Sequence, residues 1–209
     1  MFTSSRHTSS RILTLVVMVA MALLTLLPAV PARAHEVEPP LFELRFPQET
    51  EVTEFSPTFG ARRSGGRRHR GNDLMAPKMT EVYAAAGGIV RTVGTSRNGG
   101  RYIEIDHLGG WTTMYVHLNN DNPVSDDNDA DWSLTVAPGV GEGSWVTAGQ
   151  LIGWVGDSGN AEGTGSHTHF ELALEGHEID PYQLLVEAYD RDDDRYWSML
   201  RAATPDIMT

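Results

Sequence analysis

Two histidines stand two residues apart in the stretch GTGSHTHFEL, residues 163–172. On a β-strand, side chains at positions i and i+2 point to the same face, so His167 and His169 would project together while Thr168 faces away. A solvated strand face is the common explanation for such a pair. The apolar side chains that follow at every second position instead indicate a partly buried strand, where imidazoles need polar partners.

Two further stretches could place polar side chains at one point. In HRGND, His69 and Asp73 stand four residues apart with a glycine between them, and both residue types are good zinc ligands. Alone, an aspartate that caps a turn beside a surface histidine is the commoner cause. In YVH, the strand period places Tyr115 and His117 on one face, although an ordinary half-buried strand has the same pattern.

The elements that must position these residues are mostly short strands separated by glycine turns. Strands are predicted at residues 82–86, 89–93, 102–106, 111–117, 151–155 and 167–174. Phe42 and Leu44 begin a predicted edge strand, and two short helices are predicted, from Pro181 to Tyr189 and at 192–203. Strands at this spacing, with turn residues between them, predict an antiparallel β domain.

Taken together and in this order, the stretches resemble the lysostaphin-type, or LytM, zinc metallopeptidase domain of peptidase family M23. The family's H-x-G-x-D and Y-x-H-L elements correspond to residues 69–73 and 115–118, and its glycine-rich run ending in H-x-H-F-E corresponds to 159–171. AAAGGIV at 84–90 and VTAGQLIGWVGDSGN at 146–160 are also similar to family segments, so the resemblance covers about residues 58–185.

The resemblance implies a mainly β fold, with one antiparallel-sheet domain of the LytM, or duplicated hybrid motif, type and a short C-terminal helix. It also implies that His69, Asp73 and His169 bind Zn²⁺. Three protein ligands leave a fourth position for water, as catalytic zinc requires, and zinc makes hydroxide available near neutral pH.

The two remaining family histidines match His117 and His167. By the resemblance they activate the water and stabilise the oxyanion of the tetrahedral intermediate, and the sequence leaves open which does which. Tyr115 is a candidate for orienting the substrate.

The implied protein is a monomeric, secreted zinc metalloendopeptidase that hydrolyses amide bonds in the stem peptides or cross-bridges of peptidoglycan. The main alternative is a catalytically idle, wall-binding regulator of other cell-wall hydrolases, and a third is a zinc peptidase that acts on other proteins. All five site residues are present, which favours catalysis.

The first 34 residues have the layout of a secretory signal peptide. Arg6 and Arg11 precede an apolar run from Ile12 to Leu27, and Ala32-Arg33-Ala34 is a small-x-small cleavage site. This predicts a secreted or envelope location, in the periplasm or otherwise outside the cytoplasmic membrane, with membrane attachment only if the segment is retained. The absence of cysteine excludes disulfides and a lipid-modified cysteine.

The rest of the chain is expected to comprise an extended, proline-rich segment at 35–57, a peptidase domain at 58–190 that the resemblance implies, and a C-terminal tail at 191–209. Inside the domain, an acidic insert at 119–142 stands where related domains carry a groove-lining loop. The formal net charge of −12 argues against general nucleic-acid binding.

One basic island stands out in this acidic chain: Arg62, Arg63, Arg67, Arg68 and Arg70. Its ordinary explanation is a solvated loop. The functional explanation is a patch that meets an anionic substrate, such as wall carboxylates, or that positions a carboxylate.

Overall fold

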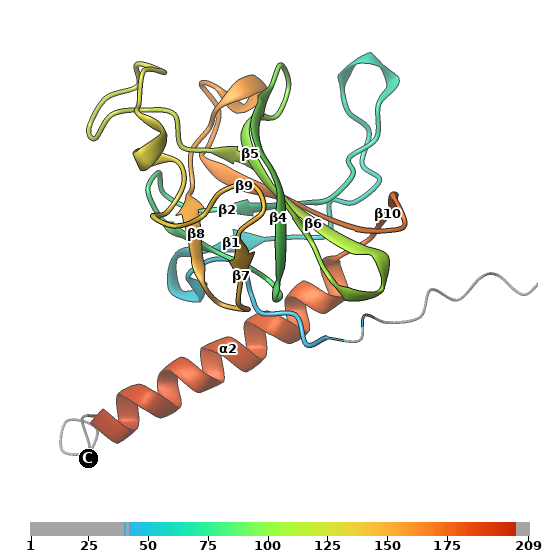
Figure 1. Ribbon diagram of the computed structural model, residues 1–209, viewed down its shortest axis with the longest axis vertical. Helices are drawn as coiled ribbons and strands as arrows, with labels where there is room; N and C mark the ends of the chain where they lie inside the picture. The colour runs from blue at the N-terminus through green and yellow to red at the C-terminus, as the bar shows by residue number, and fades with distance from the viewer. Residues whose placement is uncertain (1–39, 41, 204–209) are drawn as a thin grey trace, which may run out of the picture. The chain divides into compact units, whose positions relative to one another are not determined.

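The larger of two sheets holds eight antiparallel strands and provides the site (Figure 1). Its strands are β1 (Glu54–Phe55), β2 (Asn72–Met75), β4 (Gly88–Ser96), β5 (Gly100–Asp106), β6 (Trp111–Leu118), β7 (Trp145–Val146), β9 (His167–Leu174) and β10 (His177–Ile179). Their order is β1-β2-β9-β6-β5-β4-β7, and β10 pairs with β9. A second sheet pairs β3 (Glu81–Tyr83) with β8 (Leu151–Trp154). The predicted antiparallel, mainly β fold is confirmed.

The computed structural model describes residue 40 and residues 42–203. The expected signal peptide at 1–34 lies outside the described residues. Short 3₁₀ turns connect several strands: η1 (Thr50–Val52), η2 (Ser64–Gly66), η3 (Leu108–Gly110), η4 (Trp132–Leu134) and η5 (Gly159–Ala161). Within the described part of the chain, no helix is long and apolar enough to cross a membrane.

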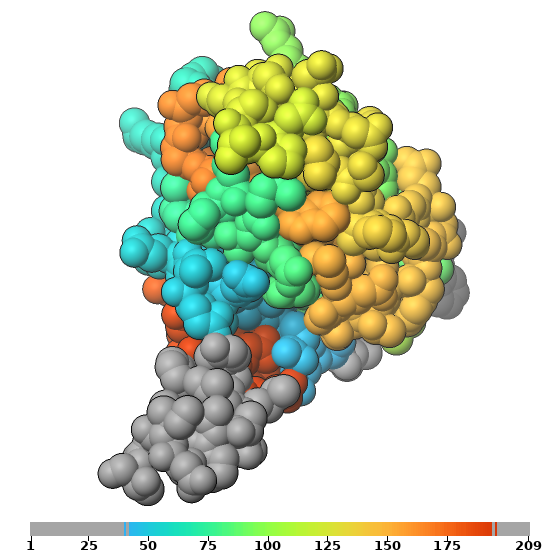
Figure 2. Space-filling model, turned by 90° about the vertical axis from the view of Figure 1, so that its left-hand side faces the viewer, coloured from blue at the N-terminus to red at the C-terminus, as the bar shows by residue number. Residues whose placement is uncertain are grey.

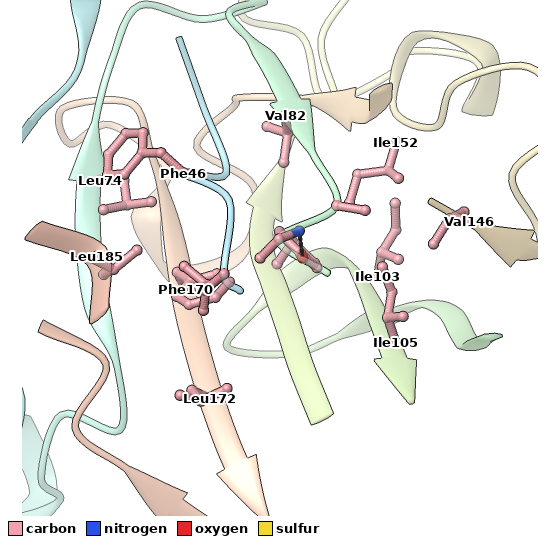
Figure 3. Close-up of a cluster of buried hydrophobic side chains, with 14 of the residues drawn as sticks. Phe46, Leu74, Val82, Ile103, Ile105, Val146, Ile152, Phe170, Leu172 and Leu185 are labelled. Atoms are coloured by element: carbon pink, nitrogen blue, oxygen red, sulfur yellow. Dashed lines mark hydrogen bonds between the residues drawn. The ribbon is translucent and has the colours of Figure 1, made fainter. Parts of the chain in front are cut away.

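The hydrophobic core joins the two sheets. Val82 of β3 and Ile152 of β8 lie in one buried cluster with Ile103 of β5 and Phe170 of β9 (Figure 3). Burying an apolar side chain of this size contributes about 1.5–3 kcal/mol to the free energy that stabilises the fold. This packed core therefore fixes the central strands β5, β6 and β9. It also fixes the positions of the side chains that these strands present on the opposite face of the large sheet.

The predicted edge strand at Phe42 and Leu44 is wrong. These residues are not in a strand, and Leu44 packs into the core, 4% exposed, together with Phe46. Pro47 follows them, and a proline cannot donate to a ladder of backbone hydrogen bonds. The edge strand of the large sheet is β1, which pairs with β2 further along the chain.

The prediction of two short C-terminal helices is also wrong. The structure has one continuous helix, α2 (Tyr182–Ala203), of 22 residues. No glycine or proline interrupts the sequence between Tyr189 and Asp192, so nothing in the backbone ends the helix there. Leu185 and Ala188 are fully buried, and the Asp192 carboxylate accepts hydrogen bonds from Arg45 and from the Phe46 amide at 3.0 and 2.9 Å.

A lysine anchors the acidic insert. Lys78 Nζ lies 2.7 Å from Asp121, 2.5 Å from Asp126 and 2.8 Å from Asp157. Figure 2 shows the insert in yellow-green. It covers the upper part of the face seen in that view, beside the green stretch that follows β2. The Lys78 ammonium group lies between these three carboxylates and partly compensates their negative charge. The cluster therefore does not require a metal ion.

Gly71 is required where the chain enters β2. A Cβ atom at this position would lie 2.0 Å from the backbone oxygen of Phe170 in β9. Gly71→Ala is therefore expected to push the two strands apart and to lower the free energy of unfolding by at least about 1–3 kcal/mol, the usual cost of overpacking. Urea denaturation measures this change. Gly141→Ala is the matched control because its Cβ would meet open space, and equal stability of the two variants would contradict the argument.

Candidate metal centre and groove

Strands β2 and β9 bring the sequence-predicted residues together. Their register places Asp73 opposite His169, and the side chains of His167 and His169 both line one groove. Thr168 between them is fully buried on the other side of the sheet. The strand period therefore predicts the orientation of this pair correctly.

Three of these side chains point their nitrogen or oxygen atoms at a common centre. His69 Nε2 lies 2.9 Å from Asp73 Oδ1 and 2.8 Å from His169 Nδ1. His169 Nδ1 lies 2.9 Å from the same Asp73 oxygen. The three atoms thus form a nearly equilateral triangle on two buried histidines and one partly buried aspartate.

Hydrogen bonds on the far sides of the two rings fix which nitrogens carry protons. His69 Nδ1 lies 2.9 Å from the carbonyl oxygen of Thr58, and His169 Nε2 lies 2.9 Å from a carboxylate oxygen of Glu171. Because both partners only accept, both nitrogens donate, and the lone pairs of neutral rings face the centre of the triangle.

This donor set fits a metal cation. Two imidazole nitrogens and a carboxylate oxygen turned toward one point repel one another unless a positive charge lies between them, and a divalent cation satisfies all three at once. Two histidines and one carboxylate form a common ligand set of catalytic zinc. Glu171 and the Thr58 carbonyl orient the rings in the way usual around metal-binding histidines.

Asp73 is ionised in this setting. Burial alone would raise its pKa, but the imidazoles of His169 and His69 against its Oδ1 atom outweigh burial and hold that pKa well below its usual range. The second oxygen, Oδ2, lies 2.5 Å from Arg63 Nη2. One oxygen of Asp73 therefore faces the centre of the triangle, and the other is held by the hairpin at residues 60–69.

Two more imidazoles lie beside the triangle. The rings of His117 and His167 are 4.9 Å apart between centroids, and His167 Nε2 lies 3.8 Å from Asp73 Oδ1. Their Nδ1 atoms lie 2.7 Å from the Ser158 carbonyl and 2.8 Å from the Gly165 carbonyl, respectively. Each Nδ1 donates, so each ring offers Nε2 as a proton acceptor. Burial lowers the pKa of His117 to about 4, so this ring is uncharged at neutral pH.

The structure does not place Tyr115 in the groove, which corrects the expectation that it shares a face with His117. Tyr115 is fully buried, and its hydroxyl accepts from the Ala85 amide at 2.7 Å and from Thr113 at 3.1 Å. The register of β5 and β6 shifts near the end of β6, and His117 has a positive φ of 64°. This irregularity breaks the two-residue alternation and turns His117 toward the groove.

The site lies in a groove of about 830 Å³. One wall is the hairpin at residues 60–69, which rises at the upper right of Figure 1, and the other wall combines the β4–β5 turn with the loop after η5. The described lining residues include none from the insert at 119–142. The expectation that the insert lines the groove is therefore wrong, because Lys78 fixes it elsewhere.

Sequence reasoning missed several groups that orient the site. Glu171 stands two residues after His169, so the same strand period could have placed it on the groove face. The carbonyl groups of Thr58, Ser158 and Gly165 leave no signal in the sequence, because every residue type carries one.

Comparison with known proteins finds a family model and relatives that are similar to part of the chain. Residues 67–130 match the model of peptidase family M23. DD-carboxypeptidase/endopeptidase Mpg of Neisseria meningitidis is 32% identical over 120 residues, covering 57% of this chain and 23% of the relative. Peptidoglycan DD-endopeptidase ShyC of Vibrio cholerae is 31% identical over 110 residues, covering 53% and 21%.

A solved structure is also similar to this chain. The catalytic domain of lysostaphin from Staphylococcus simulans has a TM-score of 0.50 and 27% sequence identity, covering 64% of this chain and 92% of that domain. The resemblance to peptidase family M23 is confirmed: residues 67–130 match the family model, and the two relatives and the lysostaphin catalytic domain are similar to this chain. The chain spans less than a quarter of the length of the two curated relatives.

Proposed function

We propose that this protein is a zinc metalloendopeptidase that hydrolyses amide bonds in the stem peptides or cross-bridges of peptidoglycan. The observation that carries the proposal is the triangle of His69, Asp73 and His169, in which both rings are oriented so that their lone pairs converge with a carboxylate oxygen. Names of relatives that refer to peptidoglycan and to endopeptidase activity support the substrate class.

The residues have separate roles in this mechanism. His69, Asp73 and His169 would hold the zinc, which when bound polarises the attacked carbonyl and lowers the pKa of water. Nε2 of His117, which is uncharged at neutral pH, is suited to accept a proton from the attacking water. The ring of His167 packs beside the ring of His117. His167 is then placed to act on the oxygen or the leaving nitrogen of the amide.

The alternative is a wall-binding regulator without catalysis. A protein that only binds peptide has no need of two further imidazoles with free Nε2 atoms beside the metal-binding triangle. Here both are present and both are oriented by carbonyl groups, which favours the peptidase.

The remaining expectations belong to the same proposal. The chain is exported to the cell envelope or beyond through its first 34 residues and acts as a monomer. The peptidase domain comprises about residues 58–190, preceded by a segment whose Leu44 and Phe46 pack into the same core.

Digestion of purified peptidoglycan, followed by mass spectrometry of the products, tests the proposal. We expect pairs of peptide fragments whose masses together exceed that of the parent by one water for each bond cut, no fragments after chelation of the metal, and recovery when zinc is added back. Intact peptidoglycan after incubation with the zinc-loaded protein would instead support the regulator.

Arg63 provides a prediction about metal affinity. Because it holds the second oxygen of Asp73, Arg63→Gln is expected to weaken zinc binding about tenfold or more, as loss of groups that orient metal ligands usually does. Competition with a chelator of known affinity measures the change. Arg62→Gln is the matched control from the same hairpin, since Arg62 does not line the groove. Equal affinities of the two variants would show that the contact has no role in metal binding.

A further inference from the structure

The groove has a charge opposite to that of the chain. Its lining includes four arginines, Arg63, Arg67, Arg68 and Arg70, and two carboxylates, Asp73 and Glu171. This gives a local formal balance of +2 from the lining residues, in a chain with a formal net charge of −12. Since a bound zinc ion would add to this positive charge, the groove favours an anionic ligand.

The four arginines are not equivalent. Arg63 is paired with Asp73 at 2.5 Å, and Arg70 is paired with Glu178 at 3.1 Å. These two charges are already compensated within the protein. Arg63 therefore has the role of positioning a carboxylate of the site itself.

Arg67 and Arg68 have no carboxylate partner among the described residues. Their contacts are with backbone carbonyl groups of their own hairpin, from Arg67 Nε to Ser64 at 3.3 Å and from Arg68 Nη1 to Gly60 at 3.0 Å. These contacts orient the guanidinium groups and leave their charge uncompensated. Each guanidinium keeps further N–H donors, in the fork geometry that matches a carboxylate.

The hairpin fixes these two residues close to the proposed metal centre. Arg68 directly precedes His69, and backbone hydrogen bonds of 2.9 Å join Arg63 to Arg67 and Ala61 to His69 across the hairpin. An extended peptide advances about 3.3–3.6 Å per residue. Arg67 and Arg68 stand two residues and one residue before His69 in the same groove lining, a backbone span of at most about 7 Å. We therefore expect a ligand group that they bind to lie about two residues from a peptide bond held at the metal.

We propose that Arg67 and Arg68 form a carboxylate-binding subsite, which makes the enzyme prefer peptides that carry a free carboxylate within about two residues of the bond that is cut. The proposal rests on the peptidase function above and adds the chemical class of the substrate group that is recognised. Three observations support this subsite: the two guanidinium groups have uncompensated charge, they line the groove, and they are close to His69.

The test compares peptide fragments of peptidoglycan with the same fragments after their carboxylates have been converted to amides. For the unmodified protein we expect kcat/KM to be about tenfold or more higher with the free carboxylates, the usual scale of hydrogen bonds to a charged group, mainly through KM. The double variant Arg67→Gln, Arg68→Gln is expected to lose this preference and to keep kcat on the amidated fragments. The matched control Arg62→Gln is expected to retain the preference.

Equilibrium binding of the same two fragments, measured by calorimetry, separates the subsite from the catalytic proposal. Preferential binding of the free carboxylates that is lost in the double variant supports the subsite, even if nothing is cleaved and the peptidase proposal fails. Equal binding of both fragments, or a preference that survives in the double variant, overturns the subsite whether or not the protein is a peptidase.

Discussion

Replacement of His169 by alanine is expected to abolish zinc binding and peptide hydrolysis together. His169 supplies one corner of the triangle, at 2.8 Å from His69 Nε2 and 2.9 Å from Asp73 Oδ1. Without it only two protein ligands remain, fewer than catalytic zinc sites use. We expect the zinc affinity to fall by more than about 100-fold, beyond the loss seen when only a supporting group is removed.

Zinc content after dialysis, together with the hydrolysis rate, measures this effect. His177→Ala is the control, because His177 is exposed on the neighbouring strand β10 and lies outside the groove lining. It is expected to retain both zinc and activity. A His169→Ala protein that still bound one zinc ion with unchanged affinity would remove His169 from the ligand set.

Replacement of His117 is expected to separate zinc binding from catalysis. Nε2 of His117 is free to accept a proton, because Nδ1 donates to the Ser158 carbonyl. Loss of a positioned proton acceptor usually costs about 10²–10⁴-fold in rate. We therefore expect His117→Asn to retain one zinc ion while kcat falls by a factor in this range, which zinc analysis and steady-state kinetics measure.

Asparagine is the suitable replacement because His117 has a φ of 64°. Asparagine adopts this conformation more readily than alanine does, and alanine would add backbone strain of about 1–2 kcal/mol. Thermal unfolding of His117→Asn and His117→Ala then reports the strain separately from the chemistry. Retention of at least half of kcat in His117→Asn would exclude His117 as a group that takes part in the reaction.

The local strand period was sufficient to predict part of the site. It placed His167 and His169 on one face and Thr168 on the other, because β9 is regular along its length. The same rule failed for Tyr115 and His117, where a register shift and a positive φ interrupt the alternation. Those irregularities depend on how β6 meets β5 and the loop at Ser158, which the period of one strand does not contain.

Long-range contacts explain the other differences between sequence and structure. The acidic insert was expected to line the groove, but Lys78, 43 residues before Asp121, holds it elsewhere. The helix after Pro181 continues through Asp192, where the side chain receives hydrogen bonds from residues 45 and 46. Neither partner is a neighbour in the sequence, so local composition could not predict these contacts.

The basic island shows how the structure sharpened an ambiguous pattern. The sequence allowed its arginines to position a carboxylate or to meet an anionic substrate. The ion pair of Arg63 with Asp73 assigns the first role to one residue, and the uncompensated charges of Arg67 and Arg68 suit the second. Composition alone cannot make this division, because it depends on which carboxylates the folded chain brings within reach.

The central claim, that one zinc ion in the triangle of His69, Asp73 and His169 supports peptide hydrolysis, is tested most directly by titrating zinc into the metal-free protein. The initial rate of hydrolysis of peptidoglycan fragments is recorded at each addition. We predict that the rate rises in proportion to zinc and reaches its maximum at one equivalent. Hydrolysis that does not depend on zinc, or a protein that binds one equivalent in the triangle without any hydrolysis, would contradict the claim.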